Sequence, residues 1–123
     1  MPMRYESTVT IDSEVSEGVR FTIARMTFGR RIDLMRRVRQ LSAQLEFEKA
    51  GPDVRDRLQA SLLGAEIDEL YLRWGLKTIE GLELDGCEPS IDSLIALGPE
   101  ALCREIIAAI KRECSLTEEE RKN

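Results

Sequence analysis

The chain has 123 residues, of which 42% are hydrophobic and 33% are charged, a composition typical of one globular domain. It contains no histidine, which excludes Ser-His-Asp and Cys-His catalysis and histidine-ligated metals. The formal net charge of -5 is unevenly spread, because residues 20–40 hold seven arginines and a single aspartate. No apolar run reaches the roughly 18 residues that a membrane-spanning helix needs.

The first 26 residues are expected to form a small β-rich segment. Residues 5–11 are rich in β-branched side chains, and residues 18–25 place Val19, Phe21 and Ile23 on one face. This alternation is typical of a half-buried strand. Because turn-forming residues lie between the two stretches, we expect a hairpin or strand pair.

A first long helix is expected over residues 28–49, because Thr27 offers an N-cap and Gly51-Pro52 follows as a stop signal. Apolar residues recur along it at helical spacing: Leu34, Val38, Leu41 and Leu45. A second row widens this apolar arc: Phe28, Ile32 and Met35. The arc is wider than one neighbouring helix needs, which favours a homo-oligomer.

A second helix is expected over residues 54–74, with Asp53 as its N-cap. Its apolar stripe contains Leu63, Ile67, Leu70 and Trp74, extended by Leu58 and Leu62. We expect Gly64, inside this helix, to permit close helix packing. The short connection between the two helices predicts an antiparallel αα-hairpin.

An extended segment is expected over residues 79–84, closed by a tight Asp85-Gly86 turn. A short helix over residues 91–97 should follow and end at Gly98.

The last long helix is expected over residues 99–113, with Pro99 in its first position and a separate final turn capped by Thr117. These elements together predict a mainly α protein with a small N-terminal β segment (α+β). In it, the αα-hairpin and the C-terminal helices surround one core. We treat residues 1–123 as a single domain, with a β-rich segment over 1–26 and a helical part over 27–123.

The remaining reactive groups do not suggest an enzyme. Three carboxylates cluster on the second helix, where a solvated edge is favoured over an acid/base or metal site: Glu66, Asp68 and Glu69. The cysteines form no CxxC pair, and we expect reduced thiols, two on helix faces and one in a loop: Cys103, Cys114 and Cys87. The N-terminus lacks the apolar segment of a signal peptide, so we expect a cytoplasmic protein. No catalytic residue, cofactor or metal is expected.

The arginine-rich stretch is the strongest candidate for binding. It suits ion pairing within the chain, an acidic protein surface or nucleic acid. Nucleic acid is the least favoured of the three, because the patch lacks lysine, has few aromatic neighbours and lies in an otherwise acidic chain. The candidate partner-binding residues are Arg30, Arg36, Arg37, Phe28 and Trp74. Trp74 also fits a core position.

Several short passages in the C-terminal half are similar to one protein family. They are residues 72–76 (LRWGL), 79–86 (IEGLELDG), 97–102 (LGPEAL) and 116–123 (LTEEERKN). Over about residues 70–123, and more weakly over residues 19–37, the chain resembles the tail assembly chaperones of long-tailed bacteriophages and related prophages.

The resemblance implies a small, mainly helical protein of the bacterial host cytoplasm that takes part in phage tail assembly. Such chaperones bind the tape measure protein and the tail tube subunits, keep them from aggregating until the tube polymerises, and are absent from the finished virion. Some exist in a longer form made by a ribosomal frameshift. The resemblance supplies no catalytic residue.

Two other functions remain open at this stage. One is a structural virion component, such as a tail-completion or head–tail joining protein, and the other is a small DNA-binding or protein-binding regulator. The expected partners are proteins, including further copies of the same chain. No membrane is expected, and nucleic acid is the least favoured partner.

Overall fold

Three strands and four helices are formed within the described part of the chain. The computed structural model describes the backbone of residues 2–49 and 54–122 and the side chains of residues 2–43 and 57–114. In chain order the elements are β1 (Thr8–Asp12), β2 (Arg20–Ala24), α1 (Phe28–Lys49), α2 (Val54–Gly75), β3 (Leu76–Glu80), α3 (Ile91–Leu97) and α4 (Glu100–Lys122). The prediction of a mainly helical α+β fold is confirmed.

The sheet has the order β1-β2-β3, and both pairs of neighbouring strands are antiparallel. The predicted N-terminal strand pair is confirmed. We expected an extended segment over residues 79–84. In the structure the strand β3 begins earlier, directly after α2, because the backbone pairs with β2 from Leu76 onward. β3 therefore brings the extended segment expected within residues 27–123 into the sheet as a third strand.

Gly81 ends β3 in a left-handed backbone conformation, with φ of +81°. A Cβ atom at this position would lie 2.1 Å from the carbonyl oxygen of Gly18, so only glycine fits this close approach of two chain segments. The predicted Asp85-Gly86 turn is confirmed: both residues have positive φ, and Leu84 pairs with Cys87 across the turn.

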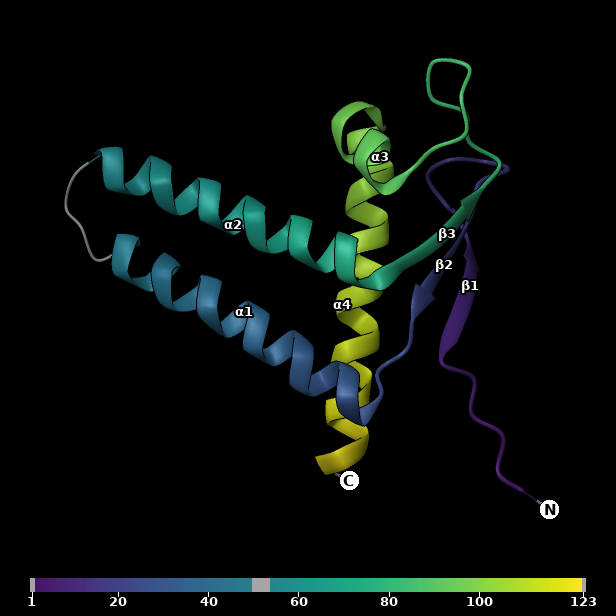
Figure 1. The fold of residues 1–123 in the computed structure, drawn as a ribbon, viewed down its shortest axis with the longest axis horizontal. Helices are drawn as coiled ribbons and strands as arrows, with labels where there is room; N and C mark the ends of the chain where they lie inside the picture. Colours follow the sequence, from purple (N-terminus) through teal and green to yellow (C-terminus); the bar gives the residue numbers. More distant parts are fainter. Residues whose placement is uncertain (1, 50–53, 123) are drawn as a thin grey trace.

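α4 lies between the sheet and the base of the helical hairpin (Figure 1). Its apolar face packs on β2, α2 and α3, and six side chains in this core are at most 1% exposed: Phe21, Ile23, Leu94, Leu102, Ile106 and Ile110. Burying each side chain of this size stabilises the fold by about 1.5–3 kcal/mol. The loop after β1 is also tied to α4, because Ser13 Oγ and the Glu14 N–H donate to the Glu105 carboxylate at 2.6 and 2.7 Å.

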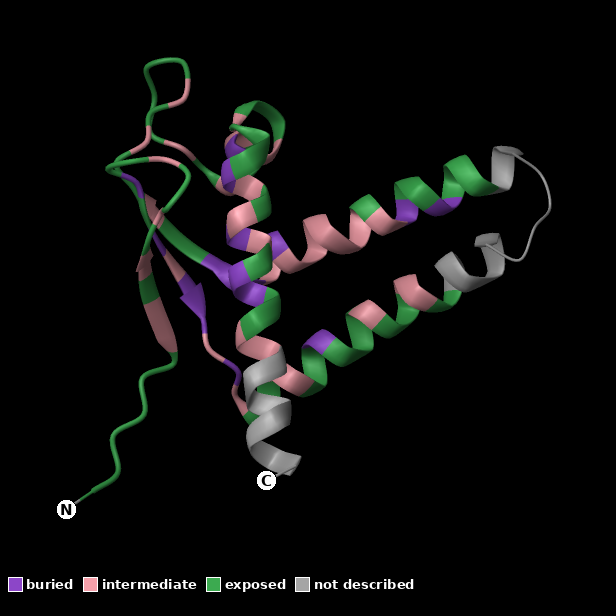
Figure 2. Ribbon diagram, turned by 180° about the vertical axis from the view of Figure 1, so that it is seen from behind, coloured by how far each residue is buried: buried purple, intermediate pink, exposed green. Residues whose placement is uncertain are grey.

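The predicted αα-hairpin is confirmed, and α1 and α2 project together away from the sheet and α4 (Figure 1). The predicted N-cap of α1 is confirmed as well, since the Arg30 N–H donates to Thr27 Oγ1 at 3.2 Å. Few residues of the hairpin are buried, as Figure 2 shows; in its described part these are Leu34, Ala60, Leu63, Leu72 and Gly75. Among the described side chains, a smaller share of the hairpin than of the sheet and α4 is therefore buried.

Three helical predictions were wrong. α4 continues to Lys122 instead of stopping at residue 113, because no proline or glycine interrupts its backbone there. Leu58 and Leu62 do not extend the apolar stripe of α2, since each lies on a different side of the helix from Leu63 and is exposed. Gly64 does not mediate close packing, because a Cβ atom there would meet nothing within 4 Å.

Smaller differences concern the helix ends. α4 begins at Glu100, and Pro99 precedes it, with its carbonyl oxygen accepting from the Cys103 N–H at 3.1 Å. The short helix is confirmed over Ile91–Leu97 with Ser90 as its N-cap. Some predictions concern positions outside the described residues and side chains, namely Leu45, Gly51, Pro52 and Asp53.

Candidate protein-binding groove

A groove of about 890 Å³ lies where α1, α2 and α4 meet. Six apolar or aromatic side chains from α1 and α2 form its lining: Ile32, Leu34, Met35, Val38, Ile67 and Tyr71. Their positions follow from helical spacing, because α1 turns residues 34 and 38 toward α2 and leaves residues 32 and 35 at the edge. The groove is therefore apolar inside and open along α1.

Four basic residues line the same groove: Arg31, Arg36 and Arg39 from α1 and Lys111 from α4. Two of them are held by contacts within the fold. Arg31 Nη2 donates to the carbonyl oxygen of Cys114 at 3.1 Å, and Lys111 Nζ lies 2.8 Å from Asp68 Oδ1 and 5.2 Å from the centre of the Tyr71 ring. Arg36 and Arg39 are exposed, and within the described residues neither forms an ion pair. They are the cations that remain available to a partner.

An apolar row continues along α1 at the edge of the groove. Phe28, Ile32 and Met35 follow each other at steps of four and three residues, and they are 77%, 39% and 59% exposed. The predicted widening of the apolar arc is therefore present in the structure, but this part of the arc is covered by no other described element. Large apolar side chains in such a row are costly to expose to water.

Arg37 and Trp74 lie at a second, shallower recess on the seam between α1 and α2. Arg37 Nε lies 3.2 Å from Asp33, one turn earlier on α1, and both side chains are at least half exposed. Trp74 is half-buried and packs against the hydrophobic core, as its position in the apolar stripe of α2 suggests. The structure thus separates these two predicted residues from the groove that Arg36 lines.

Arg30 has a different role from the other arginines of α1. Its Nη1 atom donates to the carbonyl oxygens of Ser7 and Arg25, the latter at 2.9 Å, and the residue is half-buried. It therefore fastens the first turn of α1 to the chain segments on either side of the β1–β2 hairpin. Its guanidinium is engaged with backbone acceptors of the fold, a contact that its selection as a candidate partner-binding residue did not anticipate.

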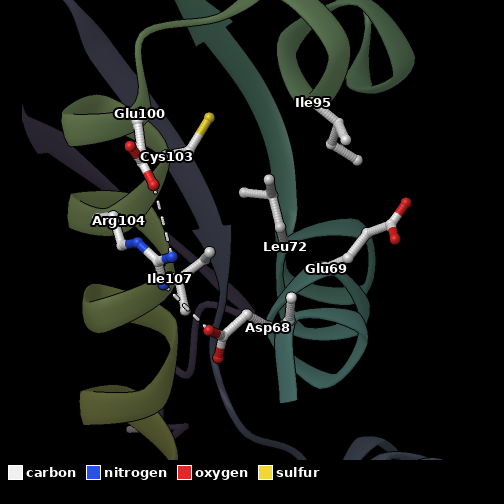
Figure 3. A pocket seen from close by; sticks show the side chains of 9 residues that line it. Asp68, Glu69, Leu72, Ile95, Glu100, Cys103, Arg104 and Ile107 are labelled. Atoms are coloured by element: carbon white, nitrogen blue, oxygen red, sulfur yellow. Dashed lines mark hydrogen bonds and ion pairs between the residues drawn. The ribbon is translucent and has the colours of Figure 1, made fainter. Parts of the chain in front are cut away.

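The carboxylate cluster on α2 is used for ion pairs between helices. Asp68 lines a small pocket between α2, α3 and α4, where one of its oxygens binds Arg104 at 3.1 Å (Figure 3). Its other oxygen binds Lys111 at 2.8 Å. Glu69 pairs with Arg73. The hydrogen bond that Arg73 donates to Asp92 contributes most to raising the pKa of Arg73, and its hydrogen bond to Glu69 raises it further. The expectation of a merely solvated edge was wrong for Asp68, because two cations of α4 reach it.

The cysteines lie apart from one another, and no disulfide joins them. Cys87 is exposed in the turn after Leu84, and Cys103 and Cys114 are half-buried on α4, as the sequence suggested. Burial raises the pKa of the Cys103 thiol.

Metal-binding clusters and membrane-spanning helices are both absent from the described part of the chain. No cluster of three or more cysteine, aspartate or glutamate side chains there is arranged to hold a metal ion. No helix within residues 2–49 and 54–122 combines the length and the hydropathy needed to cross a bilayer.

Sequence reasoning did not assemble the groove, since Arg36 alone among its lining residues was a predicted site residue. Ile67 was predicted only as part of the apolar stripe of α2, and Tyr71 and Lys111 belong to the groove through the packing of α2 and α4 against α1. Arg39 was within reach of prediction, since it lies four residues after Met35 on the exposed row. Comparison of the chain with protein-family models, with curated proteins and with solved structures found no match.

Proposed function

We propose that this protein is a non-enzymatic phage tail assembly chaperone that binds the tape measure protein, the tail tube subunits or both. The observation that carries the proposal is the exposed apolar row of Phe28, Ile32 and Met35 beside the groove. An interaction protein needs such a surface, and large exposed apolar rows are otherwise uncommon on a small domain. The similarity of residues 70–123 to the tail assembly chaperones supports the particular assignment.

The chaperone acts by mass action in this proposal. Tape measure proteins are long and helical, and their apolar faces associate with each other before the tube forms. A chaperone that occupies one such face lowers the concentration of protein available for self-association. This function requires surface and affinity but no reacting group, which fits a chain whose Asp68 and Glu69 carboxylates serve ion pairs.

The proposal includes a bacterial host cytoplasm as the location and a homo-oligomer as the unbound state. Self-association would cover the same apolar row and would therefore compete with the partner. Light scattering that gives only the monomer mass across the micromolar range would contradict the oligomer without affecting the chaperone assignment.

Co-expression tests the function. The tagged chain is expressed with the tape measure and tube proteins encoded beside it, and the complex is isolated at about 50 mM and about 500 mM NaCl. We expect recovery of one of these proteins at both salt concentrations, because apolar contacts contribute most of the affinity. Recovery of neither, with both expressed, would contradict the proposal.

The fate of the chain separates a chaperone from a virion component. Purified phage particles should lack the chain while infected cells contain it. Its presence in particles at a fixed ratio to the tube subunit would contradict a chaperone that is released on assembly.

A further inference from the structure

We propose that the groove between α1, α2 and α4 binds an amphipathic helix with an acidic edge, and that Arg36 and Arg39 set the register of that helix. This inference rests on the proposed function and deepens it, because it names the site and the chemical class of its occupant. Three features support the inference: the spacing of the apolar row, the charge of the groove, and which cations of the groove form ion pairs within the chain.

The spacing of the exposed side chains favours a helix. Phe28, Ile32, Met35 and Arg39 follow one another at steps of four, three and four residues, so they lie on one line along α1. At 1.5 Å per residue this line is about 16 Å long, or about three turns. A second helix that lies along α1 presents apolar anchors at the same intervals, which is how helices dock in apolar grooves.

The charge of the groove selects an acidic partner. Every charged side chain that lines it is basic: Arg31, Arg36, Arg39 and Lys111. Lys111 is paired with Asp68, whereas Arg36 and Arg39 form no ion pair within the described residues. Carboxylates flanking the apolar face of the incoming helix would complement these two cations, and a lysine-flanked face would be repelled.

Other occupants fit these observations less well. A small ligand would leave Phe28 uncovered, since that residue lies one turn before Ile32, beyond the groove lining. Among the described side chains of α1 and α2, a second copy offers little acidic surface, because Asp33, Asp68 and Glu69 are paired within the chain and Glu66 lies at the recess beside Trp74. Nucleic acid would use the same cations but would gain nothing from the apolar row.

Peptide binding tests the proposal. The probe is a labelled amphipathic peptide of about 18 residues, with leucines at helical spacing and glutamates on both flanks. A second peptide keeps the leucines and replaces the glutamates by lysines. Fluorescence anisotropy at about 50 mM NaCl should give the acidic peptide an affinity at least about tenfold higher. Equal affinities, or tighter binding of the basic peptide, would overturn the proposal.

Charge reversal locates the site. The double variant Arg36→Glu with Arg39→Glu should weaken the acidic peptide by about tenfold or more. The matched control is Arg37→Glu with Arg112→Glu, which makes the same change in the net charge of the chain, once on α1 and once on α4, but alters no residue of the groove lining. The control should retain affinity within about twofold, and equal losses in the two variants would show a general charge effect and overturn the assignment.

Truncation of the apolar row provides an independent measure. Ile32→Ala with Met35→Ala should weaken the acidic peptide by about tenfold, at both low and high salt. Because both side chains are exposed, the variant should keep the urea midpoint of the wild type within a small margin. Unchanged peptide affinity in a folded variant would overturn the proposal.

The two alternative occupants give distinct results. A labelled DNA duplex that displaces the peptide and loses affinity steeply with salt would assign the groove to nucleic acid and overturn the proposal. If a second copy occupied the groove, the peptide would not bind, and the double variant Arg36→Glu with Arg39→Glu would dissociate an oligomer. These two results together would also overturn the proposal.

The failure of this inference is distinguishable from the failure of the proposed function. If the charge-reversal variant still recovers the tape measure or tube protein on co-expression, the chaperone assignment stands and the groove assignment fails. If the acidic peptide binds as expected but neither tail protein is recovered, the groove assignment stands and the chaperone assignment fails.

Discussion

Asp68 of α2 accepts a hydrogen bond from Lys111 of α4 at 2.8 Å, and this contact joins the projecting hairpin to the helix that covers the sheet. The second oxygen of Asp68 binds Arg104, seven residues or about two helical turns earlier on α4. The same carboxylate thus links α2 to two successive turns of α4 and holds Lys111 at the groove.

Asp68→Ala is expected to destabilise the protein by about 1 kcal/mol, because two charge-assisted hydrogen bonds are lost while both cations keep access to water. Urea unfolding followed by circular dichroism measures the change. Asp12→Ala is the control, since it removes a single pair with Arg20 in which both side chains are more than half exposed. An equal loss in both variants would contradict the structural role of Asp68.

Gly81→Ala should destabilise by about 3 kcal/mol or more, because the backbone would be strained and the new Cβ would meet the Gly18 carbonyl oxygen. Gly86 has a similar positive φ of +79° but open space around it, so Gly86→Ala should cost only about 1–2 kcal/mol. Thermal unfolding of the two variants gives the difference. Similar midpoints would show that β3 does not pass the β1–β2 loop as closely as described.

Gly75→Ala and Gly64→Ala are expected to have opposite effects. A Cβ atom at Gly75 would lie 2.7–2.8 Å from three side-chain carbons of the buried Ile110, which predicts a loss of about 1–3 kcal/mol. At Gly64 the space is open and the residue is inside α2, so alanine should stabilise by about 0.5–1 kcal/mol. Denaturant midpoints that shift in the same direction would contradict the packing of α2 on α4.

The three thiols should react at different rates. Cys87 is exposed, so iodoacetamide should modify it first at neutral pH. The pKa of Cys103 is raised by burial, so its thiolate fraction is smaller at any given pH and its modification should accelerate only in more alkaline buffer. Mass spectrometry of the modified peptides over a pH series reports the order. Cys103 reacting as fast as Cys87 at neutral pH would contradict its buried placement.

The local elements were predictable because their signals are local. Thr27 caps α1, Gly75 ends α2, and Asp85 and Gly86 adopt the turn that their sequence favours. The place of β3 in the sheet was not predictable in this way, since it pairs Arg20 with Glu80, residues that are sixty positions apart. Such a pairing depends on how α2 returns the chain to β2, which no short window of sequence contains.

The candidate site was predictable only in part for the same reason. Phe28 and Arg36 were selected from their positions on α1, and they lie on the exposed row and in the groove lining. Arg37, one residue later, lies at the opposite recess, because a step of one residue turns a helix by about 100°. Arg30 was misjudged because its backbone acceptors, Ser7 and Arg25, come from outside the helix.

The soluble fraction of the tape measure protein tests the central claim most directly. That protein is expressed alone, with the wild-type chain, and with the Arg36→Glu/Arg39→Glu variant, and the soluble and pelleted fractions are quantified. We expect the wild-type chain to raise the soluble fraction several-fold and the variant to raise it much less, because the variant occupies fewer apolar faces of the partner. A soluble fraction that is the same with and without the wild-type chain would contradict the chaperone function.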